Sequence, residues 1–386
     1  MADSVPAPKG FHVYTGRAGI AHDGRDDLAV LVSDTPAAVS GMFTRSRFVG
    51  PSVTLSRAAC ANGSARGVVV LSRNANVATG EVGQRNASEV RDGVAARLGV
   101  SADELLIAST GVIGVDYPMD SVRAAIAGLD YPTGTDLLPA ATAIMTTDTR
   151  PKAIGLRCGE ATVAGIAKGV GMIEPNMATM LTFFSTDALV EPADLDRIFR
   201  SVVERTFNAV SVDTDTSTSD SAAIFANGQA GPVDLAEFED VLYQVALHLV
   251  REIAGDGEGA SKLIEVRVTG ARDTAQAKRV GKAIVNSPLV KTAVHGGDPN
   301  WGRVAMAVGK CEDEQDIDQD RVRIGFADFD VYPGRPDADT MARLAKHLAG
   351  DEVLIRVDLG IADGAFTVYG CDLTNGYVHL NSAYTT

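Results

Sequence analysis

Apolar and polar positions along the chain follow two different periods, which predict strands in some segments and helices in others. Short apolar runs bounded by small or polar residues, at 67–71 and 105–108, are typical of buried strands. Residues 263–268 alternate apolar and polar side chains, as a strand with one covered face does. Further strands are expected at 180–184, 353–357 and 366–369.

Other segments carry apolar side chains at the three- and four-residue spacing of a helix face. One of them has Val90, Val94 and Leu98 on one side, and Ser88 is a suitable N-cap for it. The predicted helices are 88–98, 119–129, 195–207, 235–249 and 273–285. Strands and helices interleave without a strict βαβ rhythm, internal repeat or linker, which favours mixed β-sheets covered by helices.

Composition and charge narrow the class of protein. The chain has 386 residues, enough for two or three domains or for one large unit. Its formal charge is −15, from 35 basic and 50 acidic residues, which argues against a nucleic-acid partner. The four cysteines are scattered without CxxC spacing, so neither a disulfide scaffold nor a metal site is expected. No signal peptide and no long apolar span are visible, which predicts a cytoplasmic protein without a membrane segment.

The most informative stretch lies near the middle of the chain. Gly165, Gly169 and Gly171 permit positive φ or a close approach of the backbone to another group. Pro175 then precedes the apolar segment 180–184. An ordinary loop before a core strand would look the same, so the pattern alone leaves a functional interpretation open.

Residues 168–181 read KGVGMIEPNMATML, which resembles the signature of the ornithine acetyltransferase family, also called glutamate N-acetyltransferase. The resemblance extends from about Phe11 to Thr386. It implies an α+β fold of mixed β-sheets sandwiched by helices, of the self-cleaving N-terminal-nucleophile kind. It also implies that the precursor cuts itself between Ala178 and Thr179. The products would be an α segment, 1–178, and a β segment, 179–386, intertwined in one functional unit.

Thr179 is the catalytic nucleophile that the resemblance implies. A neutral hydroxyl is a poor nucleophile and needs a base. Once Thr179 is N-terminal, its own α-amine, which titrates at about 8, can take the hydroxyl proton. Before cleavage that nitrogen is an amide, so the first step would be an N-to-O acyl shift at the Ala178 carbonyl. Thr110 and Gly111 match the oxyanion hole of the family, although a Thr-Gly pair commonly just ends a strand.

The family match also implies a set of substrate-binding residues. On its own, Lys168 would be interpreted as a solvated surface residue, and the polar C-terminal tail as disordered. Thr146 and Thr147 match a Thr-Thr-Asp segment in which the family has a threonine that contacts substrate, and we prefer Thr147 for that role. The glycine-rich run at 255–262 resembles a phosphate loop but lacks its residue order, so that interpretation is rejected. The implied substrate-binding residues are Thr146, Thr147, Lys168, Thr179, Glu258, Asn381 and Thr386.

Two other segments suggest chemistry that we do not assign. Asp213, Asp215 and Asp220 resemble a calcium loop, but Thr218 stands where such a loop needs glycine. The family usually has glycine where this chain has Thr214. The segment around Trp301 matches the family, and we interpret it as structural support near the site.

The resemblance implies a ping-pong acetyltransferase of arginine biosynthesis that uses neither metal nor organic cofactor. N2-acetyl-L-ornithine would acetylate Thr179, and L-glutamate would then take the acetyl group. The expected partners are these small substrates and the chain's own α and β fragments, assembled as an oligomer of αβ units such as a heterotetramer.

Three alternatives stay open. A bifunctional enzyme would also accept acetyl-CoA, although Thr214 and residues 206–211 resemble the clavulanate-cluster paralogues, which favours a monofunctional one. A related aminopeptidase would pass its acyl group to water. A binding protein would keep the 178–179 bond intact.

Overall fold

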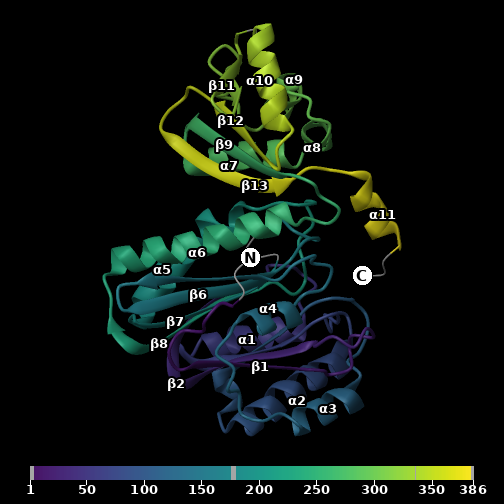
Figure 1. The fold of residues 1–386 in the computed structure, drawn as a ribbon, viewed down its shortest axis with the longest axis vertical. Coiled ribbons are helices and arrows are strands. Elements are labelled where there is room, and N and C mark those ends of the chain that lie inside the picture. The colour runs from purple at the N-terminus through teal and green to yellow at the C-terminus, as the bar shows by residue number, and fades with distance from the viewer. Residues whose placement is uncertain (1–3, 175–179, 335, 384–386) are drawn as a thin grey trace.

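The computed structural model describes residues 4–174, 180–334 and 336–383. In this part of the chain two β-sheets lie one beyond the other along the long axis of the molecule, and helices cover their faces (Figure 1). The described residues contain no helix that is both long and apolar enough to cross a bilayer.

The larger sheet has eight strands in the order β4-β3-β2-β8-β7-β6-β5, with β1 paired to β2. The pairs β3/β4 and β7/β8 are parallel and the other pairs are antiparallel, so the sheet is mixed. Its strands are β1 (Phe11–Gly16), β2 (Leu28–Phe43), β3 (Ser64–Leu71), β4 (Leu105–Ser109), β5 (Lys152–Cys158), β6 (Ala161–Lys168), β7 (Leu181–Leu189) and β8 (Ser221–Pro232).

The smaller sheet has five strands in the order β11-β10-β12-β9-β13, of which only β12 and β9 run parallel to each other. Its strands are β9 (Leu263–Ala271), β10 (Arg323–Phe326), β11 (Phe329–Tyr332), β12 (Glu352–Asp358) and β13 (Gly364–Cys371).

The helices pack on both faces of the larger sheet and around the smaller one. They are α1 (Pro51–Cys60), α2 (Gly80–Leu98), α3 (Met119–Ala127), α4 (Leu138–Ala143), α5 (Pro192–Arg205), α6 (Leu235–Gly255), α7 (Thr274–Val285), α8 (Pro288–His295), α9 (Trp301–Gly309), α10 (Ala338–Leu348) and α11 (Asn375–Ala383), with short 3-10 turns at Ala102–Glu104 and Phe207–Ala209.

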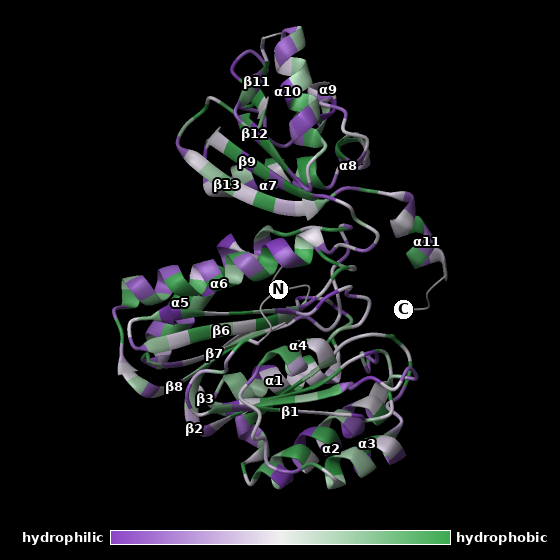
Figure 2. Cartoon of the chain, viewed as in Figure 1, coloured by the Kyte–Doolittle hydropathy of each residue, from purple (hydrophilic) through white to green (hydrophobic). Residues whose placement is uncertain are grey.

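Because side chains alternate between the two sides of a strand, each face of the larger sheet packs against a different set of helices. On β7, Phe183 points into a core shared with α1 and α4, while its neighbour Phe184 points to the opposite face, toward α5 and α6. Helices α2 and α3 cover β3 and β4 on a third cluster that includes Val90 and Val122. Hydrophobic and hydrophilic residues alternate along these helices (Figure 2), and the buried ones belong to the clusters on the sheet.

Helix α6 joins the two sheets. It packs on β5 and β6 of the larger sheet and also contacts β9 and β13 of the smaller one. Its buried side chains, among them Leu242 and Leu249, belong to one hydrophobic cluster with residues of both sheets.

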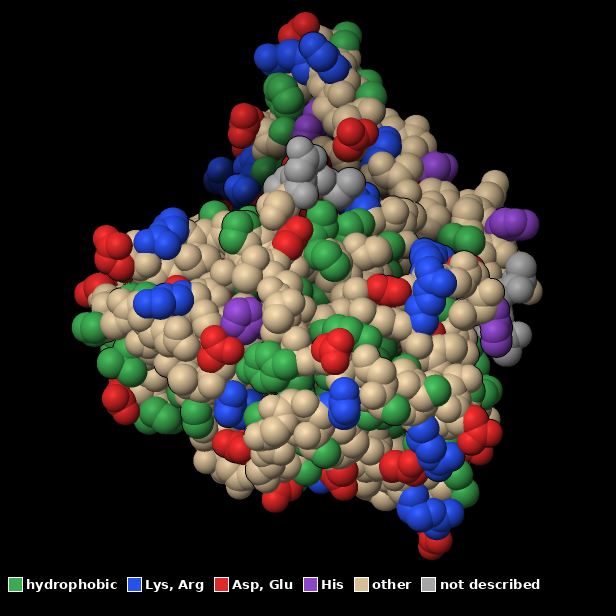
Figure 3. All heavy atoms as spheres, turned by 60° about the horizontal axis from the view of Figure 1, so that its bottom comes forward, with side chains coloured by type: hydrophobic (Ala, Val, Ile, Leu, Met, Phe, Trp, Pro, Cys, Tyr) green, Lys and Arg blue, Asp and Glu red, His purple; other side chains and the backbone are tan. Residues whose placement is uncertain are grey.

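On the face in Figure 3, acidic and basic side chains are interspersed.

The structure confirms the α+β class and most predicted elements, with corrections at helix ends. Helix α3 ends at Ala127 instead of 129, and α6 continues to Gly255 beyond the predicted 249. Helix α2 begins at Gly80, not at Ser88, because residues 81–86 continue the helix without the buried apolar side chains that would show it in the sequence; the one apolar side chain there, Val82, is exposed. Helix α5 ends at Arg205, so Phe207 lies in a separate 3-10 turn although its ring is buried. The sequence also gave no sign that β2 runs through the polar residues Ser33 to Thr35.

Candidate active site

One cavity of about 210 Å³ brings together every predicted site residue that the structure describes. They come from segments far apart in the chain: the end of β4, the loop after α4, the end of β6, the loop after α6 and α11. The predicted residues on the cavity wall are Thr110, Gly111, Thr146, Thr147, Lys168, Glu258 and Asn381. Ala178, Thr179 and Thr386 lie outside the described residues. Met180, which follows Thr179 in the sequence, is also on the wall.

The Thr110-Gly111 pair follows β4 and is fixed by close backbone packing. Thr110 N–H donates to the Leu71 carbonyl at 3.1 Å, which continues the pairing of β4 with β3. Gly111 has φ +129°, and a Cβ built there would lie 2.1 Å from the carbonyl carbon of Arg73. Glycine is therefore required at this position for conformational and steric reasons.

Lys168 is the last residue of β6, and its side chain reaches Thr110. Its Nζ donates to Thr110 Oγ1 at 3.0 Å, and the residue is only 8% exposed. Burial lowers the pKa of Lys168, and the nearby carboxylate of Asp148 opposes that shift. The expected substrate-binding cation is thus a buried group beside the expected oxyanion donor.

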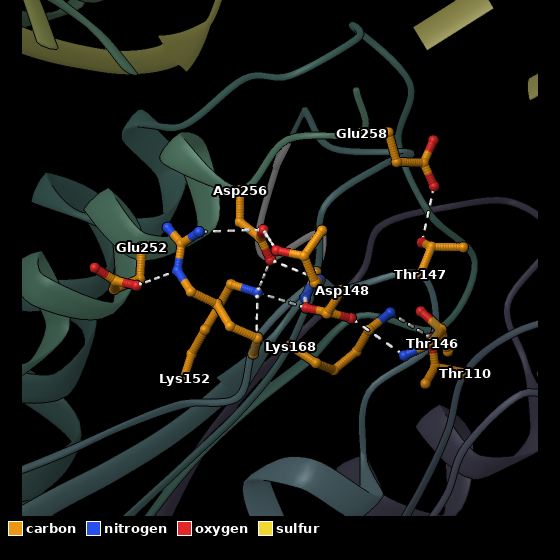
Figure 4. Close-up of polar contacts among 12 residues, drawn as sticks. Thr110, Thr146, Thr147, Asp148, Lys152, Lys168, Glu252, Asp256 and Glu258 are labelled. Carbon is orange, nitrogen blue, oxygen red and sulfur yellow. Dashed lines mark hydrogen bonds and ion pairs between the residues drawn. The ribbon is translucent and has the colours of Figure 1, made fainter. Parts of the chain in front are cut away.

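A buried ion network lies behind this pair (Figure 4). Lys152 Nζ lies 2.7 Å from Asp148 Oδ1 and 2.7 Å from Asp256 Oδ2, and all three side chains are almost fully buried. Asp148 also accepts the backbone N–H groups of Gly169 at 2.8 Å and Thr146 at 3.1 Å. Burial alone would raise the pKa of Asp148, but Lys152 and Lys168 lower it below its usual value. The network therefore ties the threonine segment, the end of β6 and the loop after α6 together.

Glu258 faces the network from the opposite wall and is held by neutral donors (Figure 4). Its Oε1 accepts from Thr147 Oγ1 at 2.8 Å, and its Oε2 accepts from Asn381 Nδ2 at 2.9 Å. No basic side chain in the described part of the chain forms an ion pair with it, so its negative charge is directed at the cavity. Gly171 packs on this carboxylate, since a Cβ there would lie 2.5 Å from Glu258 Cδ.

The loop 211–220 pairs with the residues that precede Pro175. Asp213 accepts the backbone N–H groups of Met172 at 2.6 Å and Ile173 at 2.7 Å, and burial raises its pKa. Glu174 N–H donates to the Asp215 carbonyl at 2.9 Å. Thr214 has φ +72°, in the region that favours glycine. The acidic residues of this loop thus shape the approach to the predicted cleavage site.

Two family-matched segments lie differently from what the sequence suggested. Asn381 belongs to helix α11, whereas the polar tail on its own suggested disorder, and Thr374 Oγ1 docks the start of that helix on the Gly259 carbonyl at 2.6 Å. Trp301 stacks on Tyr332, with ring centroids 5.1 Å apart, in the unit built on the smaller sheet. It is not among the residues that line the cavity, so a supporting role near the site would not involve direct contact with the cavity.

The comparison with protein families agrees with this geometry. The model of the ArgJ family matches residues 12–386, which is nearly the whole chain. The chain belongs to the ArgJ family.

Among its relatives in that family, Glutamate N-acetyltransferase Oat2 of Streptomyces clavuligerus is 64% identical, with both chains covered completely. The Arginine biosynthesis bifunctional protein ArgJ of Rhodococcoides fascians is 56% identical over 99% of this chain and 96% of its own. A crystal structure of ArgJ from Bacillus halodurans has 37% sequence identity and a TM-score of 0.49, covering 52% of this chain and 98% of that one.

Several residues on or behind the wall of this ArgJ-family cavity were not found from the sequence. Lys152 lies in a strand whose pattern gives no sign that its ammonium is buried between two carboxylates. Tyr377 of α11 lines the cavity, and burial raises its pKa to about 12. Met172 and Met180 add apolar surface. Only the spacing of Asp148 and Lys152, four residues apart, offered a signal, and that spacing is common on exposed surfaces.

Proposed function

We propose that this ArgJ-family chain transfers an acetyl group from N2-acetyl-L-ornithine to L-glutamate, with Thr179 as the carrier. The observation that supports this most strongly is the convergence of seven predicted residues on one cavity whose wall includes Met180. A chance match of motifs would have left these residues scattered over both units.

The cavity has the polarity that such a substrate requires. Lys168 supplies a cation at one wall and Glu258 an anion at another. An amino acid with an α-carboxylate and a side-chain ammonium, such as acetylornithine, can place one group on each. Thr147 and Asn381 hold the Glu258 carboxylate in place without neutralising it, and a charge-assisted contact of this kind is worth about 1.5–3 kcal/mol.

In the acetylation step, the α-amine of Thr179 takes the hydroxyl proton while Oγ attacks the acetyl carbonyl. The Thr110 hydroxyl and the Gly111 N–H stabilise the resulting oxyanion. The C–N bond then breaks, the proton passes to the departing amine, and ornithine leaves. Glutamate enters with a neutral amine, attacks the acetyl ester and returns the proton through the same α-amine, so that Thr179 is free again.

The same nucleophile accounts for maturation. In the precursor, Thr179 Oγ would attack the Ala178 carbonyl, the peptide nitrogen would become the α-amine, and water would hydrolyse the ester. This gives the α segment 1–178 and the β segment 179–386. The pairing of loop 211–220 with residues 172–174 would hold the chain in place for that attack.

Assembly of αβ units into an oligomer and a place in the cytoplasm belong to the same proposal. Use of acetyl-CoA by a bifunctional enzyme is the second candidate, because relatives carry both kinds of name. Thr214 and residues 206–211 favour the monofunctional form.

The decisive experiment is the intact mass of the purified protein under denaturing conditions, compared with a Thr179→Ala variant. The wild type should give two fragments divided at 178/179, and the variant one uncut chain. Acetylornithine should then add one acetyl group to the β fragment, and glutamate should remove it as N-acetylglutamate.

Two controls separate the alternatives. Replacing acetylornithine by acetyl-CoA in the same experiment tests the bifunctional form, because only that enzyme gains an acetyl group from it. An aminopeptidase would be cut but would lose its acyl group to water without glutamate. An uncut wild-type chain that exchanges no acetyl group would refute the proposal.

A further inference from the structure

Lys168 has a contact that binding of a substrate carboxylate does not explain. Its Nζ lies 3.0 Å from Thr110 Oγ1, in a site where both residues are at most 9% exposed. A lysine ammonium can only donate hydrogen bonds, so the Thr110 hydroxyl is the acceptor in this contact. Its own single hydrogen must therefore point elsewhere.

The remaining direction for that hydrogen is the cavity. Thr110 is on the cavity wall, and no acceptor among the described residues receives a hydrogen bond from its hydroxyl. Without Lys168, the hydroxyl could rotate and act as acceptor toward the cavity as easily as donor. An oxyanion is stabilised only by donors that already point at it.

The buried network keeps Lys168 in this place. Gly169, the next residue, is anchored through its N–H to Asp148 at 2.8 Å, and Asp148 is held by Lys152 at 2.7 Å. Lys168, at the end of β6, pairs with Leu181 at the start of β7, two residues after the predicted nucleophile. The donor, the lysine and the start of β7 therefore form one rigid unit.

We propose that Lys168 is a positioning residue that turns the Thr110 hydroxyl into an oxyanion donor, independently of any contact with substrate. This inference rests on the proposed function and assigns Lys168 a second role within it. Lysine has three N–H groups, so donation to Thr110 is compatible with a further contact to a carboxylate.

The test uses an acyl donor without a carboxylate. p-Nitrophenyl acetate can acetylate Thr179 Oγ with release of p-nitrophenolate, while the hydroxyl proton goes to the α-amine. We would measure the acetylation rate of cleaved wild type, Lys168→Met, Thr110→Val and the double variant. Methionine and valine keep the shapes of the side chains that they replace, and thermal unfolding would check that each variant is folded. Lys168→Leu, which also lacks a donor, serves as a second variant if the methionine protein does not fold.

A cation beside the α-amine also lowers its pKa, so each rate must be taken from the plateau of a full pH profile. Lys168→Met should slow acetylation about 10- to 100-fold in the wild-type background, because one oxyanion donor contributes about 10²- to 10³-fold. In the Thr110→Val background the same change should cost less than about twofold, because the group on which Lys168 acts has been removed.

Equal losses in the two backgrounds would overturn the inference, as would a Lys168→Met protein that reacts normally with p-nitrophenyl acetate and poorly only with acetylornithine. A Lys168→Met chain that stays uncut after a day would also overturn it, because maturation is a single turnover that a loss of one donor should only delay. These outcomes differ from failure of the proposed function, in which the wild type itself is neither cut nor acetylated.

Discussion

Replacing Gly171 by alanine tests the role of Glu258 without changing Glu258 itself. The new Cβ would lie 2.5 Å from both Cδ and Oε2 of Glu258. Ordinary carbon contacts are about 3.5 Å or longer, so the carboxylate would have to retreat by about 1 Å. Gly171 does not have positive φ, and alanine therefore adds no backbone strain.

The retreat would break or lengthen the contacts that fix the carboxylate, which are 2.8 Å to Thr147 and 2.9 Å to Asn381. If Glu258 binds the ammonium of acetylornithine, the substrate loses a charge-assisted hydrogen bond worth about 1.5–3 kcal/mol. At about 1.4 kcal/mol for each factor of ten, kcat/KM for acetylornithine should fall about 10- to 150-fold.

The assay is the kinetics of acetyl transfer, with the acetylation rate by p-nitrophenyl acetate as a second measurement. That ester has no ammonium group, so its rate should stay within about twofold of wild type. Gly155→Ala is the matched control, because its Cβ would meet only ordinary contacts, the nearest at 3.5 Å. If Gly171→Ala and Gly155→Ala gave the same kcat/KM for acetylornithine, the assignment of Glu258 to the substrate ammonium would be wrong.

Three further predictions concern other residues. Gly111→Ala places a Cβ 2.1 Å from the carbonyl carbon of Arg73, so the oxyanion donors should shift by about 1 Å and acetylation should slow at least about 100-fold. Gly114→Ala, also at positive φ but with nothing within 4 Å, should retain most activity; equal losses would exclude steric overlap as the cause. Thr214→Gly removes a β-branched residue from φ +72°. The free energy of unfolding should stay the same or rise by up to about 1 kcal/mol, and a clear fall in the thermal midpoint would contradict this. Burial lowers the pKa of Lys282 to about 8. In the unfolded chain this lysine has its ordinary, higher pKa, so the unfolded chain binds more protons between pH 8 and about 10.5. The free energy of unfolding of the wild type, relative to that of Lys282→Met, should therefore rise by about 3 kcal/mol across this pH range. A difference between the two proteins in urea unfolding that does not change with pH would refute the prediction.

The sequence predicted those parts of the fold whose signal is local. The stripe of α6 and the alternation of β9 are visible because one face of each is buried. The whole of β2 was not visible, because it pairs with β1 before, and with β8 after, a polar, irregular segment that begins near Ser33 and also interrupts its pairing with β3. Such a switch depends on long-range pairing, which no window of sequence contains.

The site was predictable only through residues that match a family as a set. Thr110, Lys168 and Glu258 are individually ordinary, and the fold brings them together from three separate segments of the chain. Burial decides what each of them does, and burial of a charged side chain depends on partners far away in the chain. Lys152 illustrates this, since one of its two carboxylate partners is 104 residues away.

The pairing of β6 with β7 has a consequence for a chain that is cut as proposed. Lys168 and Leu181 face each other at the ends of adjacent strands, and five further residue pairs continue the ladder to Val163 and Thr186. A cut between 178 and 179 would therefore open only the connection of a hairpin whose two arms stay zipped. Neither piece could be exchanged with that of another molecule unless the sheet were unfolded, so each pair of fragments should stay together for the lifetime of the enzyme.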